Sequence, residues 1–211
     1  MHAAAVLRLT GTERAVAEIV AVAEHVASLT SVADAFGVAA DVPSPAPHEH
    51  RLLIGPPDAH TAARSGAVLD EIAEWSRQTL GVTHVPVFWR VMAHQPRLLE
   101  TTWRKDRLLL ATGALDELLK TCVALAIAQF RQSAYWTAYF TQVLRAVHRL
   151  DDRTLVDIAG SVMHYVSFNT IAHGMRLHPP AADLTAAEVA PGGPLENVVP
   201  AVRRKAVTGN P

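Results

Sequence analysis

The sequence predicts an all-α fold, and three observations carry that prediction. Apolar residues recur at the 3.6-residue spacing of amphipathic helices through most of the chain. Eleven of the thirteen prolines lie in two places, 43–57 and from Pro179 to the end, so the stretches between them are left free to form long helices. No alternating strand pattern and no Asn-Gly hairpin separates the apolar runs.

Composition and charge exclude several classes of protein. Of the 211 residues 50% are hydrophobic and only 18% are charged, and the net charge is −1. Such a balance provides no field of one sign for nucleic acid or an anionic membrane, so we expect neither partner. The N-terminus lacks the basic start and long apolar stretch of a signal peptide, which predicts a cytoplasmic protein. The apolar composition also predicts a homo-oligomer, a dimer or larger.

The N-terminal segment 1–37 is predicted to hold one helix over about 12–35. Thr12 is a plausible first cap and Gly37 a natural stop. Its apolar face consists of Val16, Ile19, Val20, Ala23, Val26 and Ala27. Residues 38–59 carry five prolines and are predicted to be a linker.

Residues 60–178 are predicted to form a single helical domain, followed by a Pro/Gly-rich tail over 179–211. The segment Leu115–Phe130 is the most apolar of the chain, so we expect it to be the central, largely buried helix. The other helices expected in this domain are about 60–79, Pro86–His94, one that Pro96 opens and Gly113 breaks, Ser133–His148 and Asp152–Met175.

The first and last long helices repeat each other in sequence. Residues 14–35 align on 153–174 without a gap, so that His25 falls on His164 and Ala33 on Ala172. Two interpretations stay open: a chance match of two Ala/Val-rich helices, or the remnant of a first helical module. The second interpretation predicts that both helices pack on Leu115–Phe130.

Four short strings, in order along the chain, carry a family resemblance. They are Val85–Leu99, Leu115–Lys120, Ser133–Trp136 and Val166–Ala172, and the last contains a Phe-Asn-x-x-Ala sequence. Over about 85–177 the chain resembles the AhpD-like (carboxymuconolactone decarboxylase-like) superfamily. The resemblance implies an AhpD-like helical bundle, with 1–37 as a helical extension.

Redox members of that family use Cys-x-Tyr-Cys-x-x-x-His with a Glu on the preceding helix. The corresponding positions here are Ser133, Tyr135, Trp136, Phe140 and, for the Glu, Thr121. The resemblance therefore implies that the peroxidatic dithiol has been lost, because thiol chemistry needs an activated thiolate and a resolving thiol. The single cysteine, Cys122, lies in an apolar run, where a thiol is an inert small hydrophobe.

An aromatic cluster stands where the redox motif would be, formed by Tyr135, Trp136, Tyr139 and Phe140. It is either core packing or the lining of a ligand pocket. In the second case polar groups nearby would orient the ligand, with candidates Trp103, Gln129, Arg131, Ser133, His164 and Asn169.

A weaker resemblance links the chain to the group I 2-haloacid dehalogenases, which look like two such modules fused. They activate water with an acidic residue, but no catalytic Asp can be assigned here. Asp106, Asp116 and Asp157 are expected on solvated helix surfaces. Glu100 and His164 remain as acid–base candidates.

Metal and cofactor motifs are lacking from the sequence. His48 and His50 lie in a proline-rich loop without further ligands, and Arg203–Lys205 is too short for a nucleic-acid patch. We expect no metal and no cofactor.

Two functions remain after these exclusions. One is binding of, or non-redox action on, a small organic molecule, as a hydrolase or lyase on an organic acid. The alternative is a non-catalytic structural or oligomeric descendant whose former site is filled by aromatics.

Overall fold

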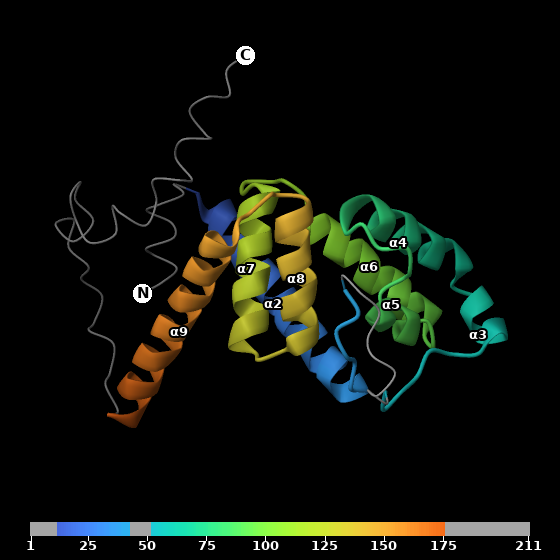
Figure 1. Ribbon diagram of the computed structural model, residues 1–211, viewed down its shortest axis with the longest axis horizontal. Coiled ribbons are helices and arrows are strands. Elements are labelled where there is room, and N and C mark those ends of the chain that lie inside the picture. Colours follow the sequence, from blue (N-terminus) through green and yellow to red (C-terminus); the bar gives the residue numbers. More distant parts are fainter. Residues whose placement is uncertain (1–11, 43–51, 176–211) are drawn as a thin grey trace, which may run out of the picture.

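The computed structural model describes residues 12–42 and 52–175, and these residues form helices connected by turns, with no strand among them (Figure 1). The predicted tail over 179–211, His48, His50 and Arg203–Lys205 lie outside the described residues. The helices are α2 (Glu13–Phe36), α3 (Ala59–Ala63), α4 (Gly66–Thr79), α5 (Val87–Met92), α6 (Pro96–Leu110), α7 (Glu117–Phe130), α8 (Ala134–Ala146) and α9 (Asp152–Gly174).

Local capping chemistry sets most of these boundaries. The Thr12 hydroxyl accepts a hydrogen bond from Ala15 N at 3.2 Å, and Asp116 and Asp151 cap α7 and α9 in the same way. Gly37 ends α2 in the left-handed conformation, with φ of 62°.

The single helix expected over 60–79 is wrong, because the structure divides it into α3 and α4 at Arg64–Ser65. The side chain of Asp58 caps a first short turn, and Gly66 at the start of α4 has poor helix propensity.

The helix α7 lies at the centre of the bundle and packs against α2, α8 and α9. Helices α4, α5 and α6 form the other side of the molecule (Figure 1). Both members of the sequence repeat, α2 and α9, therefore pack on the same central helix, as the repeat predicts.

The N-terminal helix α2 is part of the bundle and not a peripheral extension. Its residues Val22, Val26, Leu29 and Ala33 are buried in the same hydrophobic core as α5, α6 and α8. By length and hydropathy α2 would also suffice to cross a membrane. In this fold a third of that apolar window is buried inside the protein. The predicted apolar face is wrong at Val20, which is 60% exposed, because the buried face is centred on Val22, Val26 and Leu29.

One carboxylate fastens α2 to the turn that precedes α7. Glu18 accepts hydrogen bonds from Ala114 N at 2.9 Å and Leu115 N at 3.0 Å, and its carboxylate lies 3.0 Å from Lys120 Nζ. Partial burial raises the pKa of Glu18. The hydrogen bonds from these donors lower it by more, so the net pKa is about 2.

All four tryptophans of the chain belong to one aromatic cluster in the core. Trp89 contacts both Trp103 and Trp136 edge-on, with ring centroids 5.3 and 6.1 Å apart. Trp75 and Tyr139 stack at 6.2 Å. This cluster joins α4, α5, α6 and α8 through ring contacts.

Candidate functional site

The positions that the resemblance aligns with the redox motif form solid core. Ser133, Tyr135, Trp136, Phe140 and Thr121 are all at most 2% exposed. Trp136 Nε1 donates to the Leu29 carbonyl at 3.0 Å, and the Thr121 hydroxyl donates to the Glu117 carbonyl. These side chains do not line the pocket described below, so the structure supports the core interpretation of the aromatic cluster.

The other side chains singled out from the sequence are dispersed. Trp103 is buried and donates to Glu71 at 2.9 Å, and Tyr139 is buried in the aromatic cluster. Gln129 is half-buried. Arg131 is exposed and donates to Ser31.

Neither acid–base candidate from the sequence lines the cavity described below. Glu100 is exposed on α6, where its nearest ionic partner is Arg104 at 3.9 Å. His164 and Asn169 are exposed on α9. The structure therefore does not assemble these candidates into one site.

Cys122 is half-buried in α7. Burial, with a smaller contribution from the Asp116 charge, raises the pKa of its thiol to about 11. The thiol is therefore protonated at neutral pH and is a poor nucleophile.

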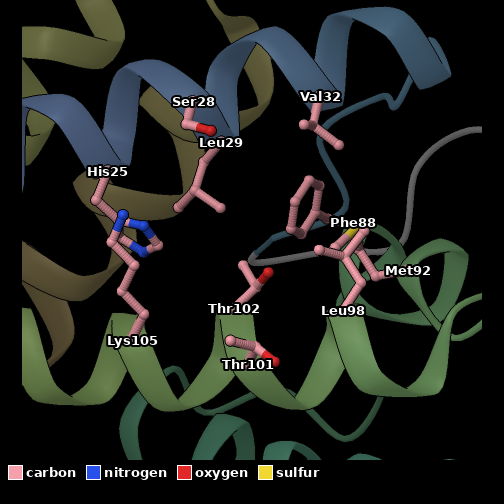
Figure 2. Close-up of a pocket in the computed structure, with 10 residues that line it drawn as sticks. All are labelled: His25, Ser28, Leu29, Val32, Phe88, Met92, Leu98, Thr101, Thr102 and Lys105. Atoms are coloured by element: carbon pink, nitrogen blue, oxygen red, sulfur yellow. The ribbon is translucent and has the colours of Figure 1, made fainter.

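A cavity of about 160 Å³ lies between α2, α5 and α6. Figure 2 shows His25, Ser28 and Lys105 at one end and Val32, Phe88, Met92 and Leu98 at the other. Leu29, Thr101 and Thr102 complete the lining. The cavity is thus amphipathic, with a polar end and an apolar end.

A buried ionic pair supports the polar end. His25 is 3% exposed and Asp106 1% exposed, and His25 Nε2 lies 3.3 Å from Asp106 Oδ1. Arg107 Nη2 donates to the other carboxylate oxygen of Asp106 at 2.6 Å. The Arg107 guanidinium in turn lies 4.1 Å from the Trp75 ring centroid, a cation–π contact that holds it in place.

The expectation that Asp106 is a solvated surface residue is therefore wrong. Asp106 lies on the buried stripe of α6 with Leu99, Trp103 and Leu110, at the spacing of a helix face. That register is visible in the sequence and is the signal that identifies Asp106 as an inward-facing carboxylate.

Electrostatics keep Asp106 ionised. Burial raises the pKa of its carboxyl, but the Arg107 guanidinium and the hydrogen bond from His25 lower it more, so its pKa lies below the ordinary value. An ionised Asp106 accepts a hydrogen bond from His25 Nε2, and this contact orients the imidazole at the polar end of the cavity.

The remaining polar groups of the cavity are donors. Lys105 is 44% exposed at the rim and donates to Glu24 at 2.7 Å. The Thr101 hydroxyl donates to the Arg97 carbonyl, whereas within 12–42 and 52–175 no protein partner is found for the hydroxyls of Ser28 and Thr102. These two hydroxyls are accessible, so they can bond water or a ligand oxygen.

Possible metal ligands were compared over the part of the chain that the structure describes. Within it, no group of three or more His, Cys, Asp or Glu side chains is placed to hold an ion.

Comparison with known proteins adds no further constraint. No family model matches the chain, and no curated protein or solved structure matches it significantly.

Proposed function

We propose that the cavity between α2, α5 and α6 binds a small organic molecule with an oxygen-bearing, anionic head and an apolar body. The head would lie among Ser28, Thr102 and Lys105, and the body against Phe88 and Met92. The observation that carries the proposal is a buried histidine, held by an ionised carboxylate, at the polar end of an amphipathic cavity.

The size of the cavity limits the ligand. A cavity of about 150 Å³ accommodates benzene, and this one measures about 160 Å³. Benzoate or a short branched alkanoate is therefore of suitable size. With the base His25 at the polar end, the chemistry would be non-redox: activation of water, as in a hydrolase, or removal of a proton, as in a lyase.

The AhpD-like resemblance supports this proposal indirectly. The thiol pair of the redox members is missing, and Cys122 has a raised pKa, so a retained function would need acid–base groups. The His25–Asp106 pair supplies them at a place other than the former thiol site.

Thermal denaturation with small carboxylates tests binding. Benzoate and 3-methylbutanoate are expected to raise Tm by about 5–10 °C at saturation, since a ligand at about 100 times its Kd contributes about 2.7 kcal/mol. Leu98→Trp, which fills the cavity, should abolish the shift. Leu108→Trp is the matched control, because Leu108 is on the same helix and 75% exposed.

Two results would contradict the proposal. One is a Tm that no small carboxylate changes, and the other is a shift that Leu98→Trp leaves intact. If binding is found, turnover is sought as halide release from 2-chloropropanoate and hydrolysis of phenyl acetate. His25→Gln should remove turnover more strongly than it weakens binding.

A second candidate, a non-catalytic structural descendant, is favoured by one observation. The aromatic side chains at the positions aligned with the redox motif are buried and pack against one another in the core. This candidate predicts neither ligand-induced stabilisation nor turnover in the experiments above.

A further inference from the structure

The C-terminal part of α9 is exposed although it is apolar. Leu155 is the buried residue of this helix, and beyond Ile158 the helix extends away from the bundle (Figure 1). Phe168 and Ile171 are each 53% exposed and Met163 is 68% exposed. From Ile158 to Gly174 the sequence contains no Asp, Glu, Lys or Arg.

One side of this segment has the spacing of a helix-pairing seam. Ser161, Tyr165, Phe168, Ala172 and Met175 follow one another at alternating intervals of four and three residues. That is the 3.5-residue repeat by which two helices pack side by side. We call these five residues the α9 seam.

The sequence repeat allows the α9 seam to be compared with the corresponding face of α2, which is buried. In the alignment of 14–35 on 153–174, the seam residues Phe168 and Ala172 correspond to Leu29 and Ala33 of α2. Leu29 and Ala33 are 3% and 1% exposed, packed into the core of the same chain. The same face that α2 buries within the chain is thus left open on α9.

We propose that a second copy of this chain covers the α9 seam, so that two α9 helices pair in a symmetric homodimer. A face without charged residues meets its own copy without like-charge repulsion, and a two-fold interface requires such a self-complementary patch. This proposal is independent of the function proposed for the cavity.

The exposed area fits a dimer of modest size. Large side chains bury roughly 150–250 Å² each, so half-exposed residues of the seam and its flanks offer on the order of 500 Å² per chain. A stable interface buries about 800 Å² per partner, and residues of the bundle beside α9 would supply the remainder.

The chain beyond α9 is a poorer occupant of the seam by composition. Residues 176–211 include six prolines but no Phe, Tyr, Trp, Ile or Met. They therefore offer no large aromatic side chain to pack between Tyr165 and Phe168, whereas a second α9 does.

Light scattering on the full chain at micromolar concentration tests the proposal. The expected mass is twice the 22.7 kDa of one chain. Phe168→Lys should return it to the single-chain value, whereas Leu108→Lys, at an apolar position of α6 that is 75% exposed, should remain dimeric. A chain ending at Met175 should also remain dimeric.

A cross-link keeps the test decisive if Phe168→Lys disturbs folding. Phe168→Cys in a Cys122→Ser background should form a disulfide-linked dimer, because residues near the centre of the seam approach their own copies. Leu108→Cys in the same background should not.

A full chain that is monomeric overturns the proposal, and if the chain ending at Met175 is then dimeric, the tail covers the seam. A dimer that Phe168→Lys leaves intact, with no cross-link through Phe168→Cys, overturns it as well.

Discussion

At the scale of single residues, Asp106 and His25 show how burial changes the meaning of a polar side chain. On a solvent-exposed helix face, Asp106 would contribute to the solubility of the protein and little to its stability. In the core its carboxylate holds two partners, His25 and Arg107. The pairing joins positions 81 residues apart, so no local sequence pattern reveals it.

Removing the carboxylate should cost substantial stability. Asp106→Ala leaves His25 without its acceptor and Arg107 with an uncompensated charge, so we expect the free energy of unfolding to fall by about 2–4 kcal/mol. Urea denaturation with an unchanged m value measures the difference. The exposed Asp157→Ala on α9 is the control and should change stability by less than about 0.5 kcal/mol.

The double variant His25→Leu with Asp106→Leu separates pairing from packing. Replacing both of these partners by apolar groups removes their desolvation cost together with the bond, so the part of the loss that comes from His25 should return. The part that comes from Arg107, which still lacks its carboxylate, should remain. Equal losses for Asp106→Ala and Asp157→Ala would show that the pair is not a structural element of the core.

At the scale of the helix, the sequence predicted the elements well because their ends are local. Thr12, Asp116 and Asp151 cap the helices that they precede, and Gly37 ends α2. The predicted and observed bounds of α2 and α9 accordingly differ by one residue at each end where they differ at all. The break at Arg64–Ser65 was missed because it interrupts an apolar pattern that itself continues.

The Glu18 contact, which fixes α2 to the turn before α7, should give a pH-dependent stability. The pKa of Glu18 is about 2 in the folded chain against an ordinary 4.5. Its stabilisation is therefore complete above about pH 4.5 and is lost as the pH falls toward 2. At pH 7 we expect Glu18→Gln to lower the free energy of unfolding by about 2 kcal/mol, allowing for solvent screening.

Denaturation of wild type and Glu18→Gln between pH 2 and pH 7 measures this difference. The gap should close at the acid end, since wild-type Glu18 is then protonated. Glu13→Gln, at an exposed carboxylate in the same helix, is the control. A gap that stays constant over the whole range would mean that the charge of Glu18 does not carry the contact.

At the scale of the whole molecule, the bundle depends on α2 as much as on any helix of the predicted domain. The predicted division into an N-terminal segment and a separate domain followed from the prolines between them. Proline content indicates that the connecting segment is not helical, but it does not indicate whether the two parts pack together. What joins α2 to the rest is tertiary: Trp136 donates to the Leu29 carbonyl, and His25 meets Asp106. The cavity also has one wall on α2, so fold and site share this helix.

Deleting residues 1–40 should therefore give insoluble or dissociated protein and not a trimmed, intact core. The face of α2 that the fold buries includes Val22, Val26 and Leu29 and shares only Val26 with the predicted face. Its burial stabilises the fold by roughly 5–10 kcal/mol before chain entropy is subtracted. That is comparable with the whole stability of a domain. The deletion also uncovers Trp136 and removes His25 from Asp106, whose carboxylate then keeps only Arg107 as its partner. Solubility, Tm and mass by light scattering measure the effect, with removal of residues 1–11 as the control that leaves α2 whole. A chain lacking 1–40 that stays soluble with an unchanged Tm and subunit count would mean that α7 and α8 form a stable core without α2.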